Sequence, residues 1–342
     1  MPSQIFHVLA GEKALALSGT VIENFDSAAF RLGCQGPDIF LHNRRTKPLA
    51  LAYGRLLHRR DYGRFCAEFV SALPPDIPAG VLSWFYGFIT HQVADRLLHP
   101  YIVYRSYTDG KTGIPGVSSA QFHAFFERIL DSELLRKTER KKLDSFDTGS
   151  SFWLSGNEID LLAKAIAPVL SAVYPGEAEK DPQILQRIRN AFTDSIYYYD
   201  ISNPRLISIH DKMGIMCMRY FVELGAAGVA LLHPDEPDPS IDWMNTEKRE
   251  WRHPVSGEKS SSSVPELFEA SVQESARVFK LLRDLLGGNL SFSDFETAIG
   301  NECLSVAGPD GKLGKVRFWD AFDLGSALLA EKEKRLAWLG TA

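Results

Sequence analysis

The chain has 342 residues, of which 45% are hydrophobic and 24% charged, and its formal net charge is −5. This balance is typical of a globular protein with one large domain or two ordinary ones, and it excludes a disordered chain. The mild acidity argues against duplex nucleic acid as a partner, because phosphate binding depends on Lys and Arg.

The first residues, MPSQIFHVLAGEKALALSG, lack the charged start and apolar run of a secretory signal. No stretch approaches the roughly 20 apolar residues that a membrane-spanning helix needs. The cysteines are scattered without a CxxC pair, so we expect them to be small buried side chains in a reducing compartment. They are Cys34, Cys66, Cys217 and Cys303. A cytoplasmic protein without a transmembrane segment is therefore expected.

Apolar residues recur with helical spacing along most of the chain, and the alternation typical of strands is rare. The pattern predicts helices over 79–99, 120–137, 156–173, 182–198, 205–232, 264–287 and 317–338. We expect Pro100 to end the first helix, Ser155 and Glu158 to form a capping box for the third, and Asp181 to cap the fourth.

The segments 100–117 and 234–265 are rich in turn-forming residues and are expected to be irregular. We find no internal repeat and no long flexible linker. The sequence therefore predicts one all-α domain over residues 1–342, with a metal-site core over about 1–140 and a helical remainder over about 150–342.

Two helical motifs combine histidine with a carboxylate. His91, Asp95 and His99 recur every four residues in GFITHQVADRLLHPYI, and His123 and Glu127 repeat the spacing in QFHAFFERIL. Residues four apart lie on one helix face, so each motif can hold one metal ion with a fixed geometry. Such pairs are often surface ion pairs, but apolar and aromatic residues surround both motifs here. A buried carboxylate needs a partner, and the metal interpretation is favoured.

Further candidate ligands precede these motifs. His7 opens an apolar helical pattern, Asp38 follows a Gly-Pro turn in LGCQGPDIFLHN, and His58 lies in GRLLHRRDYGRF. His42, one turn after Asp38, is an alternative to His58. His233 and His253 lie in Pro-rich irregular sequence and are expected on the surface. Imidazole and carboxylate ligands without cysteine suit zinc, with manganese or iron as alternatives.

The order of these motifs resembles the zinc-dependent phospholipase C family. An N-terminal His, a GPD loop, LxH, GFxxHxxxDxxxHPY and HxxxE follow one another over about residues 1–135. The later WRHPVSGE and SVPELFEASVQESA are similar to this family with lower specificity. The family is similar in fold and site to zinc-dependent single-strand nucleases. The resemblance implies an all-helical bundle with a buried cluster of up to three zinc ions.

The resemblance also implies a ligand set. It assigns Asp38, His58, His91 and Asp95 to one zinc, His99, His123 and Glu127 to a second, and His7 with Asp95 to a third that Asp95 bridges. Secreted members complete the third site with an N-terminal tryptophan. This chain begins Met-Pro with no Trp nearby, so we expect two zinc ions, and a third site that is weaker, differently completed or empty.

The function expected from this set is phospholipase C-like cleavage of a phosphodiester by metal-activated water. Asp38 is the candidate general base, because a carboxylate at the cluster can orient or deprotonate the attacking water. The expected partner is a small-molecule or lipid phosphodiester, with peripheral contact to a membrane as an open alternative. Phe152 and Trp153 are candidates for an apolar rim, although buried positions at a helix junction are favoured for them.

Other functions stay open at this point. A nuclease or nucleotide phosphatase on the same scaffold would use aromatic residues to stack bases, and Tyr101, Tyr104 and Tyr107 are available for this. The adjacent pair His210-Asp211 suggests an HD-type phosphohydrolase, which leaves the N-terminal cluster unexplained. A further alternative is a protein that binds metal without catalysing a reaction.

Overall fold

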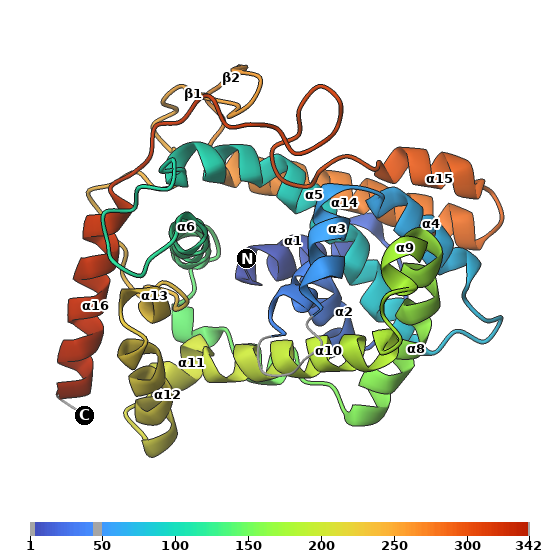
Figure 1. The fold of residues 1–342 in the computed structure, drawn as a ribbon, viewed down its shortest axis with the longest axis horizontal. Coiled ribbons are helices and arrows are strands. Elements are labelled where there is room, and N and C mark those ends of the chain that lie inside the picture. The colour runs from blue at the N-terminus through green and yellow to red at the C-terminus, as the bar shows by residue number, and fades with distance from the viewer. Residues whose placement is uncertain (1–3, 44–49, 341–342) are drawn as a thin grey trace.

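The computed structural model describes residues 4–43 and 50–340, and these are mostly helical (Figure 1). The first part of the chain forms α1 (Gln4–Ser18), α2 (Ser27–Cys34), the 3-10 helix η1 (Gly36–Leu41), α3 (Leu51–Arg59), α4 (Tyr62–Ser71), α5 (Ala79–Ser106) and α6 (Ser119–Glu133).

The middle of the chain consists of shorter helices. They are the π-helical turn η2 (Leu134–Thr138), η3 (Leu143–Ser145), α7 (Thr148–Ser151), α8 (Gly156–Val173), α9 (Pro175–Ala178), α10 (Ile184–Ile201), α11 (Pro204–Ile207), α12 (Lys212–Glu223) and α13 (Ala226–Val229). After an antiparallel pair of two-residue strands, β1 (Trp251–Arg252) and β2 (Lys259–Ser260), come α14 (Val264–Leu286), α15 (Phe292–Ile299) and α16 (Leu324–Gly340).

Helix α5 is the long central element, and α1, α2, α6 and α14 all contact it. Glycines let α2 approach it closely. A Cβ at Gly33 would lie 2.0 Å from the carbonyl oxygen of Trp84, and one at Gly87 would lie 2.0 Å from that of Phe30. Because no side chain separates the two backbones here, the end of α2 and the start of η1 lie directly against the middle of α5.

The prediction that Pro100 ends this helix is wrong. Helix α5 continues to Ser106 with Pro100 inside it. A proline within a helix removes one hydrogen bond and costs about 3 kcal/mol. The following turn is nonetheless held by tertiary contacts, because Tyr101 is fully buried and donates a hydrogen bond from its hydroxyl to the carbonyl of Trp243. Irregular structure therefore begins at Tyr107 rather than at residue 100.

Other predicted helices match more closely. The capping box of Ser155 and Glu158 is present at the start of α8, and α14 occupies its expected range. The range expected for one helix over 120–137 is divided between α6 and the π-helical turn η2. Helix α10 begins later than expected, at Ile184, and its N-cap is Gln183 rather than Asp181. The Asp181 carboxylate binds Tyr53 and Arg187. The expected helix over 205–232 is divided into α11, α12 and α13.

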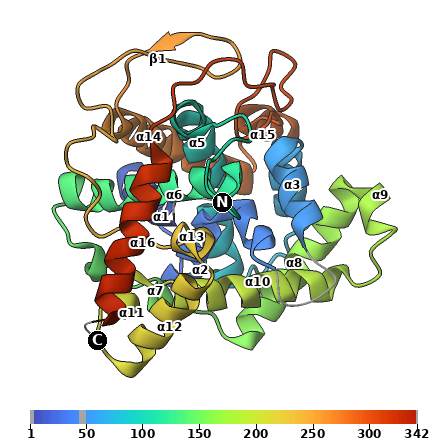
Figure 2. The same cartoon turned by 60° about the vertical axis from the view of Figure 1, so that its left-hand side comes forward.

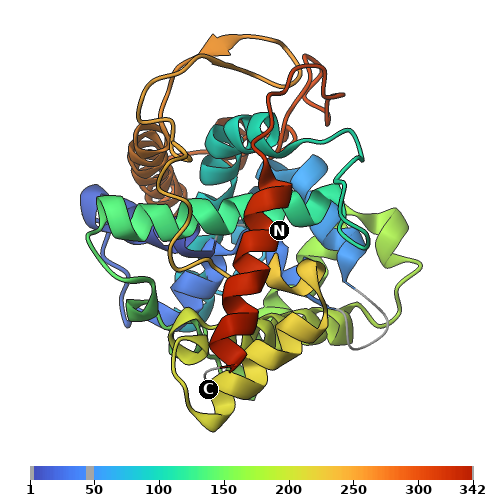
Figure 3. The same cartoon turned by 90° about the vertical axis from the view of Figure 1, so that its left-hand side faces the viewer.

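The C-terminal helix lies across one face of the molecule, beside α12 and α13, as two turned views show (Figures 2 and 3). It begins at Leu324 rather than near 317, because the preceding segment hydrogen-bonds to the end of α5. The backbone N–H of Asp320 donates to Tyr104, and that of Phe322 donates to Arg105. Among the described residues, no helix is both long and apolar enough to span a bilayer. All four cysteines are buried and free, as expected.

Candidate metal centre

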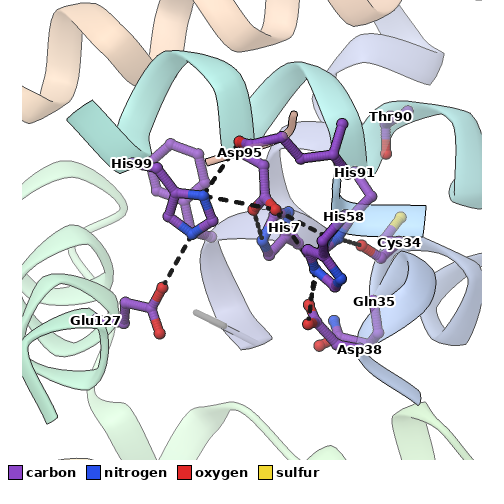
Figure 4. Close-up of polar contacts among 12 residues, drawn as sticks. His7, Cys34, Gln35, Asp38, His58, Thr90, His91, Asp95, His99 and Glu127 are labelled. Carbon is purple, nitrogen blue, oxygen red and sulfur yellow. Dashed lines mark hydrogen bonds and ion pairs between the residues drawn. The ribbon is translucent and has the colours of Figure 1, made fainter. Parts of the chain in front are cut away.

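Five elements bring the eight predicted ligands to one centre, and Figure 4 labels all of them except His123. Helix α1 supplies His7, η1 supplies Asp38, α3 supplies His58, α5 supplies His91, Asp95 and His99, and α6 supplies His123 and Glu127. Three triads have their ligand atoms within 4.8 Å of one another: His7 with Asp38 and His91, His58 with His91 and Asp95, and His99 with His123 and Glu127.

The first two triads share His91 and form one continuous group. The Nε2 atom of His58 lies 3.1 Å from Oδ1 of Asp38. The Nε2 atom of His91 lies 3.4 Å from Oδ2 of Asp38 and 3.2 Å from Oδ2 of Asp95. His7 stacks on the His91 ring at 4.3 Å, and its Nε2 lies 3.4 Å from Oδ1 of Asp95. Asp95 thus faces histidines with both of its oxygens.

The third triad lies one turn further along α5. The Nε2 atom of His123 lies 3.0 Å from Oε1 of Glu127, and that of His99 lies 3.5 Å from the same oxygen. The Nδ1 atom of His99 is 3.7 Å from Oδ2 of Asp95, so the two groups of ligands are neighbours. The i, i+4 spacing read from the sequence accounts for this arrangement on both α5 and α6.

Hydrogen bonds on the far side of three rings fix which nitrogen faces the centre. The Nδ1–H of His58 donates to the carbonyl of Gly54 at 2.7 Å, and that of His91 donates to Cys34 at 3.2 Å. The Nδ1–H of His99 donates to the carbonyl of Leu304 at 3.2 Å. Ligating histidines in metalloproteins are held in this way, with the other nitrogen presented to the metal.

Leu304 is a functional position that sequence reasoning missed. Its carbonyl accepts from His99, and its backbone N–H donates to the carbonyl of His58 at 2.8 Å. One residue from the C-terminal part of the chain thus holds candidate ligands from both groups. Both interactions use backbone atoms, so no side-chain pattern could have indicated them.

The centre has the features of a cation site. Among the described residues, several of its buried polar atoms have no hydrogen-bond partner: Asp38 Oδ2, His91 Nε2, Asp95 Oδ2 and Glu127 Oε2. The nearest neighbours of the Asp38 and Asp95 oxygens are other ligand atoms of the centre, at 3.2 to 3.4 Å. Leaving buried polar atoms without hydrogen bonds is costly, and a divalent cation among them would satisfy them together. The donors are imidazole nitrogens and carboxylate oxygens, which suit zinc. The residues present therefore fit the metal.

The carboxylates of the centre are held in their ionised form. Burial raises the pKa of the Asp95 carboxyl, but the facing His91 and His99 outweigh it and keep this pKa well below its usual range. His123 acts in the same way on Glu127, whose pKa is also lowered against the effect of burial. Ionised carboxylates are the form that binds metal.

Several alternatives from the sequence are excluded by position. His42 faces away from the centre, with its Nδ1 3.1 Å from the Ser195 hydroxyl, so His58 is the histidine that meets Asp38. The pair His210-Asp211 suggested an HD-type enzyme, but Asp211 caps α12 and the exposed His210 packs on Trp338. Neither residue belongs to the metal centre.

The expectation for His233 is wrong. It is buried against Asp131, whereas His253 is half-buried. The start of the chain, Met1 to Ser3, on which the expectation about the third zinc site depends, lies outside the described residues.

The candidate aromatic residues are divided between core and surface. Tyr101 is buried, and Tyr104 and Tyr107 are partly exposed. Phe152 is buried as favoured from the sequence, but Trp153 is 61% exposed. Tyr101 therefore packs and cannot stack a base.

Comparison with known proteins gives an independent result. A family model described as zinc dependent phospholipase C matches residues 4–175, which contain every candidate ligand. No curated protein matches the chain, and no solved structure matches it. The matched residues make up half of the chain, and members of this family are metal-dependent hydrolases of phosphodiesters. The chain belongs to the zinc-dependent phospholipase C family.

Proposed function

We propose that this chain cleaves a phospholipid at the phosphodiester of its headgroup, with at least two zinc ions held at the centre. Asp38 would join His58, His91 and Asp95 to hold one ion, since it lies 3.1 Å from His58 and 3.4 Å from His91. His99, His123 and Glu127 would hold the second. His7 and Asp95 would contribute to a third. Bound zinc supplies a polarising charge for the phosphate and a water molecule of lowered pKa.

One observation carries this proposal. Eight imidazole and carboxylate side chains from five helical elements converge, and buried oxygens of Asp38, Asp95 and Glu127 lack hydrogen-bond partners. A purely structural network would pair these oxygens with donors, because low-dielectric surroundings penalise partly satisfied polar groups.

Asp38 is the group best placed to act as general base. Only 2% of it is exposed, it faces His58 and His91, and these histidines lower the pKa of its carboxyl although burial raises it. An ionised carboxylate at this position can orient the attacking water and accept its proton. We expect Asp38→Asn to reduce the hydrolytic rate by about 100-fold or more. Full rate with zinc bound would remove Asp38 from this role.

The cluster has two exposed ends where substrate can enter. The side chains of His58 and His123 are 18% and 21% exposed, whereas that of Asp95 is 2% exposed. Beside His123 lies a pocket of about 240 Å³, lined by Val103, Ser106, Tyr107, Ser119 and Ala120. This lining is uncharged, so it suits a neutral arm of the phosphodiester.

Zinc content per chain tests the proposal. We expect about two or more zinc ions by plasma mass spectrometry on protein purified without chelator. His91→Ala and His123→Ala lie in different triads, and each should lose about one ion. Wild-type protein without metal, and without stabilisation on adding zinc, would show that the cluster is structural.

A substrate comparison separates the remaining functions. We expect release of phosphorylated headgroup from phosphatidylcholine vesicles, and a loss of this activity in Asp38→Asn. Faster cleavage of single-stranded DNA or of a nucleotide ester would favour the nuclease alternative. Zinc binding without cleavage of any phosphodiester would leave a metal-binding protein.

A further inference from the structure

Asp131 is a buried carboxylate on α6, one turn beyond Glu127 and on the same helix face as His123. It does not face the metal centre directly. Its Oδ1 atom accepts a hydrogen bond from the backbone N–H of Phe6 at 2.8 Å, and its Oδ2 atom accepts one from Ile5 at 3.1 Å. The helix that carries two candidate ligands therefore also holds the beginning of α1.

These two bonds hold the first described turn of α1. The first N–H groups of a helix have no acceptor within the helix, and a negative charge at this end is favourable. One carboxylate that binds two successive N–H groups fixes both the position and the rotation of the helix end. His7 is the next residue, and its Nε2 lies 3.4 Å from Asp95.

His233 holds the same carboxylate from the opposite side. Its Nε2–H donates to Oδ2 of Asp131 at 2.9 Å, and both side chains are almost completely buried. The carbonyl of His233 accepts a hydrogen bond from the Arg335 guanidinium at 2.7 Å, and Arg335 also pairs with Glu331 on α16. Residues outside the family match of 4–175 are thus connected to α1 through one carboxylate.

We propose that Asp131 is a positioning residue that sets His7 against the metal cluster, and that His233 keeps the Asp131 carboxylate in place for this. The proposal rests on zinc binding as proposed above. Asp131 acts on the group of ligands that contains His7, and not on the triad of His99, His123 and Glu127. Loss of Asp131 should therefore weaken one zinc site selectively.

Zinc affinity, measured by competition with a chelator, tests this directly. We expect Asp131→Ala to weaken the site that contains His7 by about tenfold or more, the usual effect of removing a group that orients a ligand. The ion at His99, His123 and Glu127 should be retained. If Asp131 acts through His7, the double variant with His7→Ala should bind no more weakly than His7→Ala alone.

Matched variants separate positioning from general stability. Glu133→Gln is the control, because Glu133 is equally buried on α6 but pairs with Arg136 and Lys137 instead of α1. It should lower Tm without changing zinc affinity. His233→Ala should weaken the His7 site, and His233→Gln, which keeps an N–H donor, should restore it. If Asp131→Ala does not fold, the zinc affinities of His233→Ala and His233→Gln test the proposal by themselves.

The outcomes distinguish this proposal from the proposed function. Wild-type protein that binds no zinc would overturn the function. Wild-type protein that binds zinc, with unchanged affinity in the Asp131 and His233 variants, would overturn the positioning role. Equal weakening of the site that contains His7 and of the site of His99, His123 and Glu127 would also overturn it, since that pattern indicates a general loss of folding.

Discussion

Gly36 lies directly against a ring of the metal cluster. Its φ of +54° is disfavoured for other residues, and a Cβ built on it would lie 2.3 Å from Cγ of His91. It also begins the 3-10 turn that carries Asp38. The glycine of the GPD loop is therefore required both by the backbone conformation and by the adjacent histidine ring.

We expect Gly36→Ala to destabilise the fold by about 1 to 3 kcal/mol from backbone strain alone, and to reduce zinc content because the His91 ring must move. Urea unfolding and plasma mass spectrometry would measure the two effects. Gly110→Ala is a suitable comparison, since Gly110 has a φ of +77° but nothing within 4 Å of its Cβ position. Equal zinc content in both variants would contradict the steric argument.

Asp181 makes α3, the helix that carries His58, sensitive to acid. It pairs with Arg187 at 2.6 Å and accepts a hydrogen bond from the hydroxyl of Tyr53 on α3 at 3.0 Å. Burial raises the pKa of the Asp181 carboxyl, but these two partners outweigh it and the net pKa is lowered. The stabilisation is therefore complete above the unfolded pKa of about 3.9, and it is lost as pH falls through the lower folded value.

Asp181→Asn should accordingly be less stable than wild type at pH 7, with a difference that shrinks below about pH 4. Urea unfolding of both proteins across this range measures it. The exposed Asp310 offers a control, because its replacement by Asn should change stability little at any pH. A constant difference between wild type and Asp181→Asn down to pH 3 would refute the assignment.

At the scale of elements, the side chain of Arg96 on α5 binds several backbone carbonyls of the segment from Ile299 to Leu304. The guanidinium of Arg96 donates to the carbonyls of Ile299 at 2.6 Å, of Gly300 at 3.1 Å and of Glu302 at 3.1 Å. Leu304 at the end of this segment holds the His99 ring. Arg96 therefore supports the orientation of a candidate ligand without touching the metal centre.

Replacing Arg96 by Gln should lower the free energy of unfolding by about 2 to 3 kcal/mol, because three charge-assisted hydrogen bonds are lost. It should also weaken zinc binding at the triad that contains His99 by about tenfold or more. Arg277→Gln is the matched control, since Arg277 is exposed and forms an ion pair with Glu274 on its own helix. Loss of stability without any change in zinc affinity would leave Arg96 a purely structural residue.

At the scale of the whole molecule, the metal centre joins segments that are distant in sequence. Its ligands come from α1, η1, α3, α5 and α6, and through Leu304 it is connected to the C-terminal part of the chain. A ligand that binds only the folded state stabilises it, by about 2.7 kcal/mol at a concentration 100-fold above Kd. Zinc should therefore stabilise the entire molecule rather than one region.

Removing zinc with EDTA should lower Tm by several degrees, and adding zinc back should restore it. Differential scanning calorimetry of wild type and His91→Ala, each with and without EDTA, measures this effect. EDTA should lower the Tm of His91→Ala by less than that of wild type, because the variant lacks a ligand shared by two triads. An identical Tm for wild-type protein in both conditions would contradict a role for metal in stability.

The helical class and the ligand motifs could be predicted from the sequence, because helical periodicity and i, i+4 spacing are local properties. All eight candidate ligands meet at one centre, and the family match confirms the zinc-dependent phospholipase C family. Their individual roles, a single domain over residues 1–342 and a cytoplasmic location stay predictions.

Tertiary structure decided what depends on contacts between distant residues. Packing of Tyr101 carries α5 beyond Pro100, the geometry of η1 and α3 selects His58 over His42, and burial of His233 connects Asp131 to the C-terminal part. Backbone atoms make several of these contacts, as at Leu304, and backbone atoms are the same in every residue. The sequence by itself therefore determined which side chains are available for the chemistry, and the fold determined which of them face one another and what holds them there.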